Sequence, residues 1–129
     1  MININSTSNN RTSKHKSFDL EERTAKFGEN TIIFCSGLMI TDISKPVINQ
    51  LVRSSTSVGA NYMEANGSDS KKDFTNKISI CKKEAKETCH WLRMLSVIYP
   101  NEKEKLRNLW KESRELTLIF AAIIKKVKK

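Results

Sequence analysis

The sequence predicts an all-α fold, an up-down antiparallel four-helix bundle, on three observations. Apolar residues recur with helical spacing through most of the chain after residue 17. The connections between these periodic segments are short, which makes consecutive long helices antiparallel neighbours. The length of 129 residues suits one domain with a core of its own.

The first 17 residues, MININSTSNNRTSKHKS, are rich in Asn, Ser and Thr and contain almost no apolar side chains. Such a composition cannot bury enough surface to fold, so we expect a disordered basic tail at 1–17 ahead of a bundle domain at 18–129. A start-site or cloning artefact is the alternative for this tail. The chain shows no apolar leader and no run of membrane-spanning length, so we expect a cytoplasmic protein with no membrane role.

The first two helices are expected at about 19–39 and 45–66. We expect Asp19 to cap the first helix, with Glu22 three residues later as its capping-box partner. Pro46 lies in the first turn of the second helix, where no amide donor is missed. Gly67 is expected to end the second helix in a left-handed conformation.

The third and fourth helices are expected at about 70–98 and 101–126. Ser70 and Asp73 form a capping box at the start of the third, and the fourth begins at Asn101. Both repeat apolar residues at alternating steps of three and four, which is typical of antiparallel packed helices. Further apolar residues lie off these stripes, Trp91 and Trp110 among them, and indicate a second buried face and therefore a homo-oligomer.

One segment of the second helix, SSTSVGAN at 54–61, consists mostly of poor helix formers, and a loop is the alternative there. Apolar positions nevertheless continue through it along one helical face. Ser55 and Gly59 lie four residues apart on or beside that face, where small side chains let another backbone approach closely, in the bundle or across a subunit contact. Ser and Thr hydroxyls can also bond to the carbonyl one turn back. We therefore predict a closely packed helical segment.

The segment from Leu51 to Leu95 resembles a family of small four-helix-bundle proteins encoded within intervening sequences of 23S ribosomal RNA genes. The family pattern R-S-x-x-S-x-x-A-N-x-x-E begins here at Arg53 and ends at Glu64. It is followed by S-K-K-D-F at 70–74 and by K-E-A-x-E-T-x-x-W-L at 83–92. Cys89, His90 and the long basic N-terminal tail depart from the family pattern.

The resemblance implies a protomer that assembles as a ring-shaped homopentamer. A relative in this family, the accessory variability protein of diversity-generating retroelements, binds nucleic acid and a reverse transcriptase. The resemblance therefore implies nucleic acid, and a protein such as a reverse transcriptase, as partners.

The formal net charge is +9, and the basic surplus lies in the N-terminal tail and from residue 71 onward. This charge favours an anionic partner, nucleic acid before membrane. The main candidate surface is a basic stripe on the third helix, where residues at steps of 11, 3, 4 and 3 share one face: Lys72, Lys83, Lys86, His90 and Arg93, with Lys82 alongside. The alternative is a solvated helix face whose charge is softened by Glu84 and Glu87.

The lysines at the C-terminus, Lys125, Lys126, Lys128 and Lys129, form a second candidate binding element. They can act as a flexible arm that binds phosphates, or they can complement the helix dipole, and the sequence leaves both interpretations open.

A further set of residues is assigned to a helix or subunit contact: Arg53, Ser55, Gly59, Asn61, Glu64 and Trp91. Its polar members can form a network with Glu84 or Glu87. The alternative makes Glu64 a general acid or base, but no His or Cys lies near it in sequence. Cys81 and Cys89 are too far apart on a helix for one metal ion. We predict no catalytic residue, metal ligand or cofactor.

Together these patterns predict a non-enzymatic oligomeric bundle that binds RNA or DNA through phosphate contacts, as an accessory to a nucleic-acid-processing partner. The alternative function is a protein–protein interaction scaffold with no nucleic-acid role.

Overall fold

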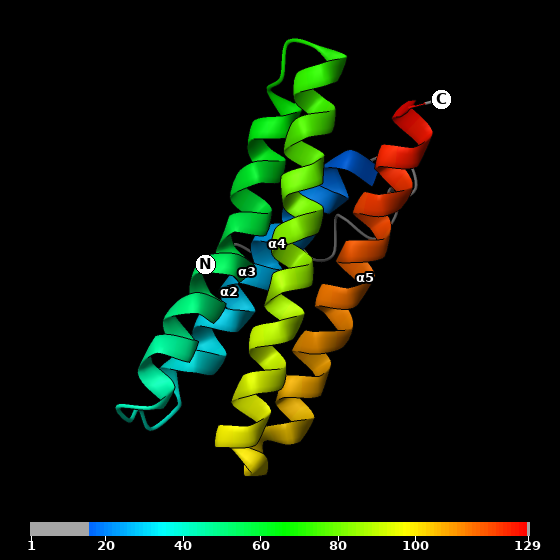
Figure 1. Cartoon of the computed structure of the whole chain (residues 1–129). Helices are drawn as coiled ribbons and strands as arrows, with labels where there is room; N and C mark the ends of the chain where they lie inside the picture. Colours follow the sequence, from blue (N-terminus) through cyan, green and yellow to red (C-terminus); the bar gives the residue numbers. More distant parts are fainter. Residues whose placement is uncertain (1–15, 129) are drawn as a thin grey trace, which may run out of the picture.

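In the computed structural model, which describes residues 16–128, the chain folds into an up-down four-helix bundle (Figure 1). Its helices are α2 (Lys16–Ser36), α3 (Ser44–Asn66), α4 (Lys71–Ile98) and α5 (Lys103–Lys128), and a short 3₁₀ helix, η2 (Pro100–Glu102), leads into α5. Each helix packs against the next along the chain, and α2 also contacts α5. The predicted all-α four-helix fold is confirmed.

The first helix differs from its predicted bounds at both ends. It begins at Lys16, so Asp19 lies inside its first turn and does not precede the helix as a cap. It ends at Ser36 and not at Met39, because the amides of Gly37 and Leu38 donate to carbonyls three residues back, at 3.2 and 3.1 Å. Residues 1–15 of the predicted tail lie outside the described residues, whereas residues 16 and 17 are helical.

The other helix ends follow local hydrogen bonding. Gly67 follows α3, but its φ of −94° is not left-handed, because its amide closes a turn onto the Glu64 carbonyl at 3.1 Å. Ser70 caps α4, with its hydroxyl accepting a hydrogen bond from the Asp73 amide at 3.0 Å. The fourth helix begins at Lys103 and not at Asn101, because the chain after Tyr99 first makes the tighter 3₁₀ turn.

The core lies where the apolar stripes of the four helices meet. The stripe on α4 and its counterpart on α5 are almost wholly buried, and the buried members are Ile78, Cys81, Ala85, Thr88, Leu92, Leu95, Leu106, Leu109, Ser113, Leu116 and Phe120. The Ser113 hydroxyl donates to the Ala85 carbonyl at 2.6 Å, which fixes how the two helices are aligned. This alignment decides which surface residues of α4 and α5 face each other.

The segment of small residues at 54–61 is helical and crosses α2 at close range. A Cβ atom at Gly59 would lie 3.3 Å from the backbone carbonyl of Thr24, and one at Gly28 would lie 3.4 Å from the Cα atom of Thr56. The hydroxyl of Ser54 donates to the carbonyl of Leu51, three residues back, at 3.3 Å. The small side chains therefore allow close backbone contact between α2 and α3 within one protomer.

Candidate nucleic-acid interface

The basic residues of α4 line a hollow on the outer surface of the bundle. Lys82, Lys86, His90 and Arg93 follow one another at steps of four, four and three, so they share one side of the helix. The hollow has a volume of about 490 Å³ and is completed by Cys89 of α4 and by Trp110, Arg114 and Thr117 of α5. The structure thus brings together four members of the predicted stripe.

A second row of cations on α5 faces this stripe. Lys103, Arg107, Lys111 and Arg114 repeat the steps of four, four and three. The first three line an adjoining hollow of about 420 Å³, whose other lining residues are Leu92, Arg93, Ser96, Leu106 and Trp110. This row was not predicted, although its spacing is visible in the sequence, because only the alignment of α4 with α5 shows that the two rows face each other.

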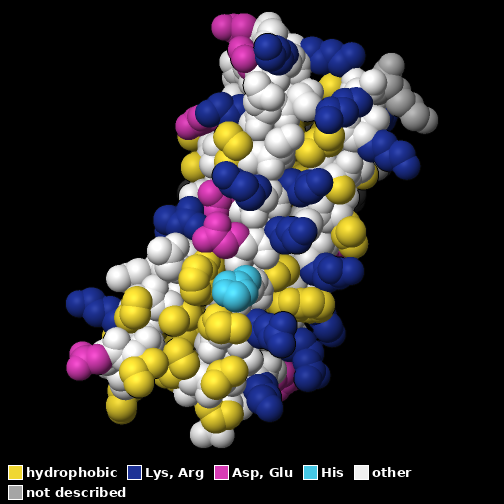
Figure 2. Space-filling model, in the orientation of Figure 1, with side chains coloured by type: hydrophobic (Ala, Val, Ile, Leu, Met, Phe, Trp, Pro, Cys, Tyr) yellow, Lys and Arg dark blue, Asp and Glu magenta, His cyan; other side chains and the backbone are white. Residues whose placement is uncertain are grey.

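The two hollows share Arg93 and Trp110, and together we call them the α4–α5 groove. Seven Lys and Arg side chains line it: Lys82, Lys86, Arg93, Lys103, Arg107, Lys111 and Arg114. Within the described part of the chain, no Asp or Glu lines either hollow and none of these cations forms an ion pair. Figure 2 shows Lys and Arg side chains gathered over α4 and α5.

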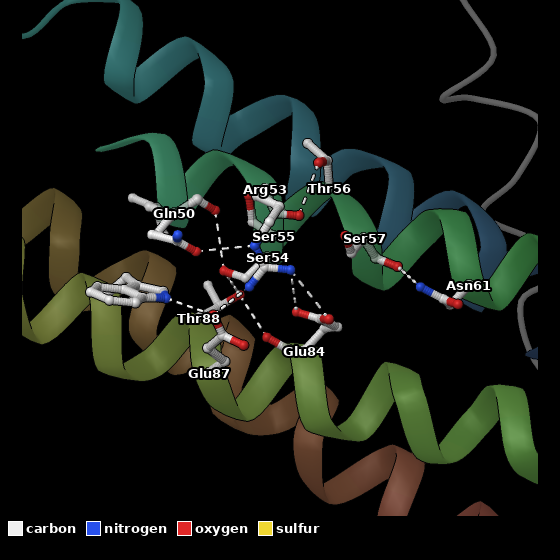
Figure 3. Close-up of polar contacts among 12 residues, drawn as sticks. Gln50, Arg53, Ser54, Ser55, Thr56, Ser57, Asn61, Glu84, Glu87 and Thr88 are labelled. Atoms are coloured by element: carbon white, nitrogen blue, oxygen red, sulfur yellow. Dashed lines mark hydrogen bonds and ion pairs between the residues drawn. The ribbon is translucent and has the colours of Figure 1, made fainter. Parts of the chain in front are cut away.

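The glutamates of α4, Glu84 and Glu87, do not line this groove but point toward Arg53 of α3 (Figure 3). Arg53 of α3 donates from Nη1 to the two carboxylate oxygens of Glu84 at 3.2 and 3.3 Å, and it also pairs with Glu87. The Trp91 indole donates to Glu87 at 2.9 Å. This hydrogen bond, the Arg53 contact and the nearby charge of Lys83 hold the pKa of Glu87 below its usual value.

Two glutamates of α5 are engaged on its other side, by α2. The Arg23 guanidinium contacts both oxygens of Glu112, at 2.7 and 2.9 Å, and it also pairs with Glu115. The hydrogen bond to Glu112 is the main reason why the pKa of Arg23 is raised. Four glutamates of α4 and α5 are therefore paired with Arg23 and Arg53 outside the groove.

The remaining predicted cations do not line the groove. Lys83 lies on the side of α4 that carries Glu87, and Lys72 lies in the first turn of α4. Lys125, Lys126 and Lys128 are exposed in the last turn of α5, at the end of the bundle where α4 begins (Figure 1). Lys129 lies outside the described residues.

The residues assigned to a helix or subunit contact do not form one common network within the protomer. The Ser55 hydroxyl donates to the Val52 carbonyl, and the Asn61 amide donates to the Ser57 carbonyl. Glu64 pairs with Lys77 and is not part of the Arg53 network. Arg53 and Trp91 do share that network, through Glu87.

The cysteines have the character of core thiols. Cys35 and Cys81 are buried, and burial raises the pKa of Cys35 to about 11 and that of Cys81 to about 12. Burial also raises the pKa of Cys89, which lies at the groove. Thiols with raised pKa values are poor nucleophiles and poor metal ligands at neutral pH. Among the described residues, no three His, Cys, Asp or Glu side chains are grouped as a metal site would require.

The bundle fold and the α4–α5 groove together define a small helical protein with an exposed cationic surface. Residues 41–122 match the family described as 23S rRNA-intervening sequence protein, and because this is more than half of the chain, the protein belongs to that family. The resemblance carried by residues 51–95 is thereby confirmed. No curated protein matches the chain.

A solved structure supports the same assignment. It is a crystal structure of a protein of unknown function from the S23 ribosomal protein family of Bacteroides thetaiotaomicron. The two chains are 30% identical, with a TM-score of 0.77, and the match covers 85% of this chain and 98% of that one. Across residues 16–128, no helix is both long and apolar enough to span a membrane.

Proposed function

We propose that this protein binds nucleic acid through its phosphates in the α4–α5 groove, and that its role is binding and not catalysis. One observation carries the proposal: seven Lys and Arg side chains line a single groove, while four glutamates of the same two helices pair with Arg23 and Arg53 elsewhere. Clustered cations that form no ion pair within the protein are suited to replacing the counterions of successive phosphates.

The family supports an RNA-related role, because its description refers to intervening sequences of 23S rRNA. Phosphate contacts do not distinguish RNA from DNA, so the proposal covers both. An accessory role beside a nucleic-acid-processing protein, such as the reverse transcriptase that the resemblance implies, belongs to the same proposal.

We also propose that the protein is a homo-oligomer, with the five subunits that the resemblance implies. Apolar side chains at the end of the bundle where α2 leads into α3 support self-association: Ile33, Met39 and Ile43 are 69%, 82% and 74% exposed. Several grooves on one assembly would bind a long polyanion more tightly than a single groove. Sedimentation equilibrium of the full chain tests this.

The test of binding is fluorescence anisotropy with a mixed-sequence RNA and a DNA duplex, titrated from low to high salt. A complex that neutralises several phosphates loses affinity linearly in log salt, with a slope of about −0.7 to −0.9 per phosphate. The variant K82E/K86E/R93E should lose at least about tenfold in affinity at moderate salt, and its slope should become shallower by about 2 to 3.

A charge-matched control separates this groove from general electrostatics. The variant K26E/K45E/K105E reverses three exposed lysines outside the groove and changes the net charge by the same amount. We expect it to retain most of the wild-type affinity. Equal losses in the two triple variants would show that net charge, and not the groove, accounts for binding.

The alternative function, a protein–protein interaction scaffold, is favoured by the same exposed apolar residues near the α2–α3 connection. If the intact oligomer binds neither the RNA nor the DNA duplex at low salt, the nucleic-acid proposal fails and the scaffold becomes the leading function.

A further inference from the structure

Trp110 occupies an unusual place for a large aromatic residue. It lies in the middle of the α4–α5 groove and lines both hollows, and its exposed fraction is 40%. The guanidinium carbon of Arg114 is 5.8 Å from its ring centroid, which places a cation over the indole. Among the described residues, no group accepts a hydrogen bond from its indole N–H, in contrast to Trp91, which donates to Glu87.

The hollow beside Trp110 has a lining that matches a nucleotide. The indole provides an exposed apolar face, and Arg93, Lys103, Arg107 and Lys111 provide positive charge at the same place. Leu92 and Leu106 are almost fully buried, so they form the floor, whereas the cations are exposed at the rim. A nucleotide combines the flat, stackable face of its base with an anionic phosphate, so it complements this combination.

We propose that the groove binds single-stranded nucleic acid, with one base stacked on Trp110 and the flanking phosphates held by the two rows of cations. This inference rests on the proposed function and specifies its ligand. In a duplex the bases are stacked on one another and paired, and one can reach the indole only after it is unstacked. Duplex binding therefore uses the cations of the groove without Trp110.

The length of the groove is consistent with a short stretch of one strand. Its lining on α4 extends from Lys82 to Ser96, which at 1.5 Å per residue is about 21 Å. At the 3.4 Å spacing of stacked nucleotides in one strand this corresponds to about six nucleotides, and to fewer in an extended strand. We therefore expect a site size of a few nucleotides per protomer.

The experiment compares three polyanions that differ in their bases: a fluorescently labelled oligouridylate, a blunt RNA duplex and inorganic polyphosphate. W110A should lower affinity for the oligouridylate by about tenfold, because stacking on an aromatic side chain typically contributes that much or more per base. Its affinity for the duplex and for polyphosphate should stay within about twofold. W110F keeps an aromatic face and should retain most of the binding to oligouridylate.

W91F is the matched control, because it changes the other of the two tryptophans, which lies in the Arg53 network. It should bind all three polyanions as the wild type does. It also leaves Trp110 as the sole tryptophan, so its emission reports directly on the site. Oligouridylate should quench this emission, and polyphosphate should not.

The outcomes separate this inference from the proposed function. Suppose that K82E/K86E/R93E abolishes binding, but W110A lowers the affinity for all three polyanions equally or for none of them. The groove then binds phosphates without stacking, and the inference is wrong. The inference is also wrong if W110A changes the sedimentation behaviour and the W91F emission does not respond to oligouridylate, because Trp110 then serves a subunit contact. If the wild type binds no nucleic acid, the proposed function fails with it.

Discussion

The α2–α3 contact and the α4–α5 contact are built in different ways. Between α2 and α3, glycines let the backbones meet, and a single added Cβ atom at Gly59 would lie 3.3 Å from the Thr24 backbone. Between α4 and α5, larger side chains such as Leu92 and Leu106 fill the inner side, and an open groove remains on the outer side. The α2–α3 contact thus rests on close backbone packing, whereas the outer side of the α4–α5 contact is hollowed and lined by charged residues.

The arginines of α2 and α3 also differ from the cations of the α4–α5 groove in how their charges are used. Arg23 on α2 and Arg53 on α3 each pair with two glutamates, so both guanidinium charges are paired within the protomer. The cations of the α4–α5 groove have no such partners among the described residues. One region therefore uses arginine for structure, and the other leaves cations available for a ligand.

The largest expected effect comes from filling the α2–α3 contact. G59L places a side chain against backbone atoms of Thr24, which cannot move aside as a flexible side chain would. We expect the free energy of unfolding to fall by about 2 kcal/mol or more, because overpacking a close helix contact is destabilising. Urea unfolding followed by circular dichroism measures this.

G37L is the control for that substitution. Gly37 is exposed just beyond the end of α2, and a Cβ atom there would meet only the Phe34 carbonyl, at 3.7 Å. Its urea midpoint should stay close to that of the wild type. If G59L and G37L unfold alike, the close approach of α2 and α3 does not limit side-chain size.

Much of this fold could be predicted from the sequence because helical periodicity survives even where propensity is poor. The small residues at 54–61 keep the apolar face of α3, and packing against α2 and α4 outweighs their weak preference for helix. Helix ends were predicted less well: Gly67 is not left-handed, and α2 begins before Asp19. Such ends depend on turn hydrogen bonds that residue type alone does not determine.

The candidate site was predicted only in part. Spacing along α4 identified Lys86, His90 and Arg93, because side chains on one helix share a face regardless of tertiary structure. It placed Lys83 on that face and Lys82 beside it, whereas Lys82 lines the groove and Lys83 does not. The opposite row on α5 depends on the alignment fixed by Ser113 and Ala85, which is a contact between distant parts of the chain. The sequence analysis named Glu84 and Glu87 both as softening the stripe and as partners of Arg53, and the structure shows the second.

A smaller effect is expected from removing one arginine in each region. R23M removes a partly buried arginine that contacts both oxygens of Glu112, and should lower the free energy of unfolding by about 1 kcal/mol without changing RNA affinity. R93M removes a groove cation and should change stability by less than about 0.5 kcal/mol. It should weaken RNA binding severalfold and make the salt slope shallower by about 0.7.

Both substitutions remove one positive charge, so each serves as the control for the other. Urea unfolding and anisotropy are measured on the same two proteins. A loss of RNA affinity in R23M equal to that in R93M, with both variants folded, would contradict the assignment of Arg23 to stability and of Arg93 to binding.

The smallest effect concerns the pH dependence of the Arg53 network. The folded-state pKa of Glu87 is lowered, mainly by the Trp91 hydrogen bond and then by Arg53, so the folded protein binds this proton less readily than the unfolded chain does. The stabilisation is therefore present above the carboxylate's unfolded-state pKa, near 4.5, and is lost as the pH falls through the lower folded-state value. For a partly exposed ion pair we expect this contribution to be below about 1 kcal/mol.

The variant E87Q isolates this contribution, because its amide oxygen can still accept the Trp91 hydrogen bond but cannot titrate. Urea unfolding at pH 7 and pH 3.5 should show a smaller loss of stability in E87Q than in the wild type. E22Q, which removes an exposed carboxylate from α2, is the control and should behave as the wild type does. An equal acid-induced loss in the wild type and in E87Q would mean that the charge of Glu87 does not contribute to stability. The contact between Arg53 and Glu87 would then position the two side chains without stabilising the fold through their charges.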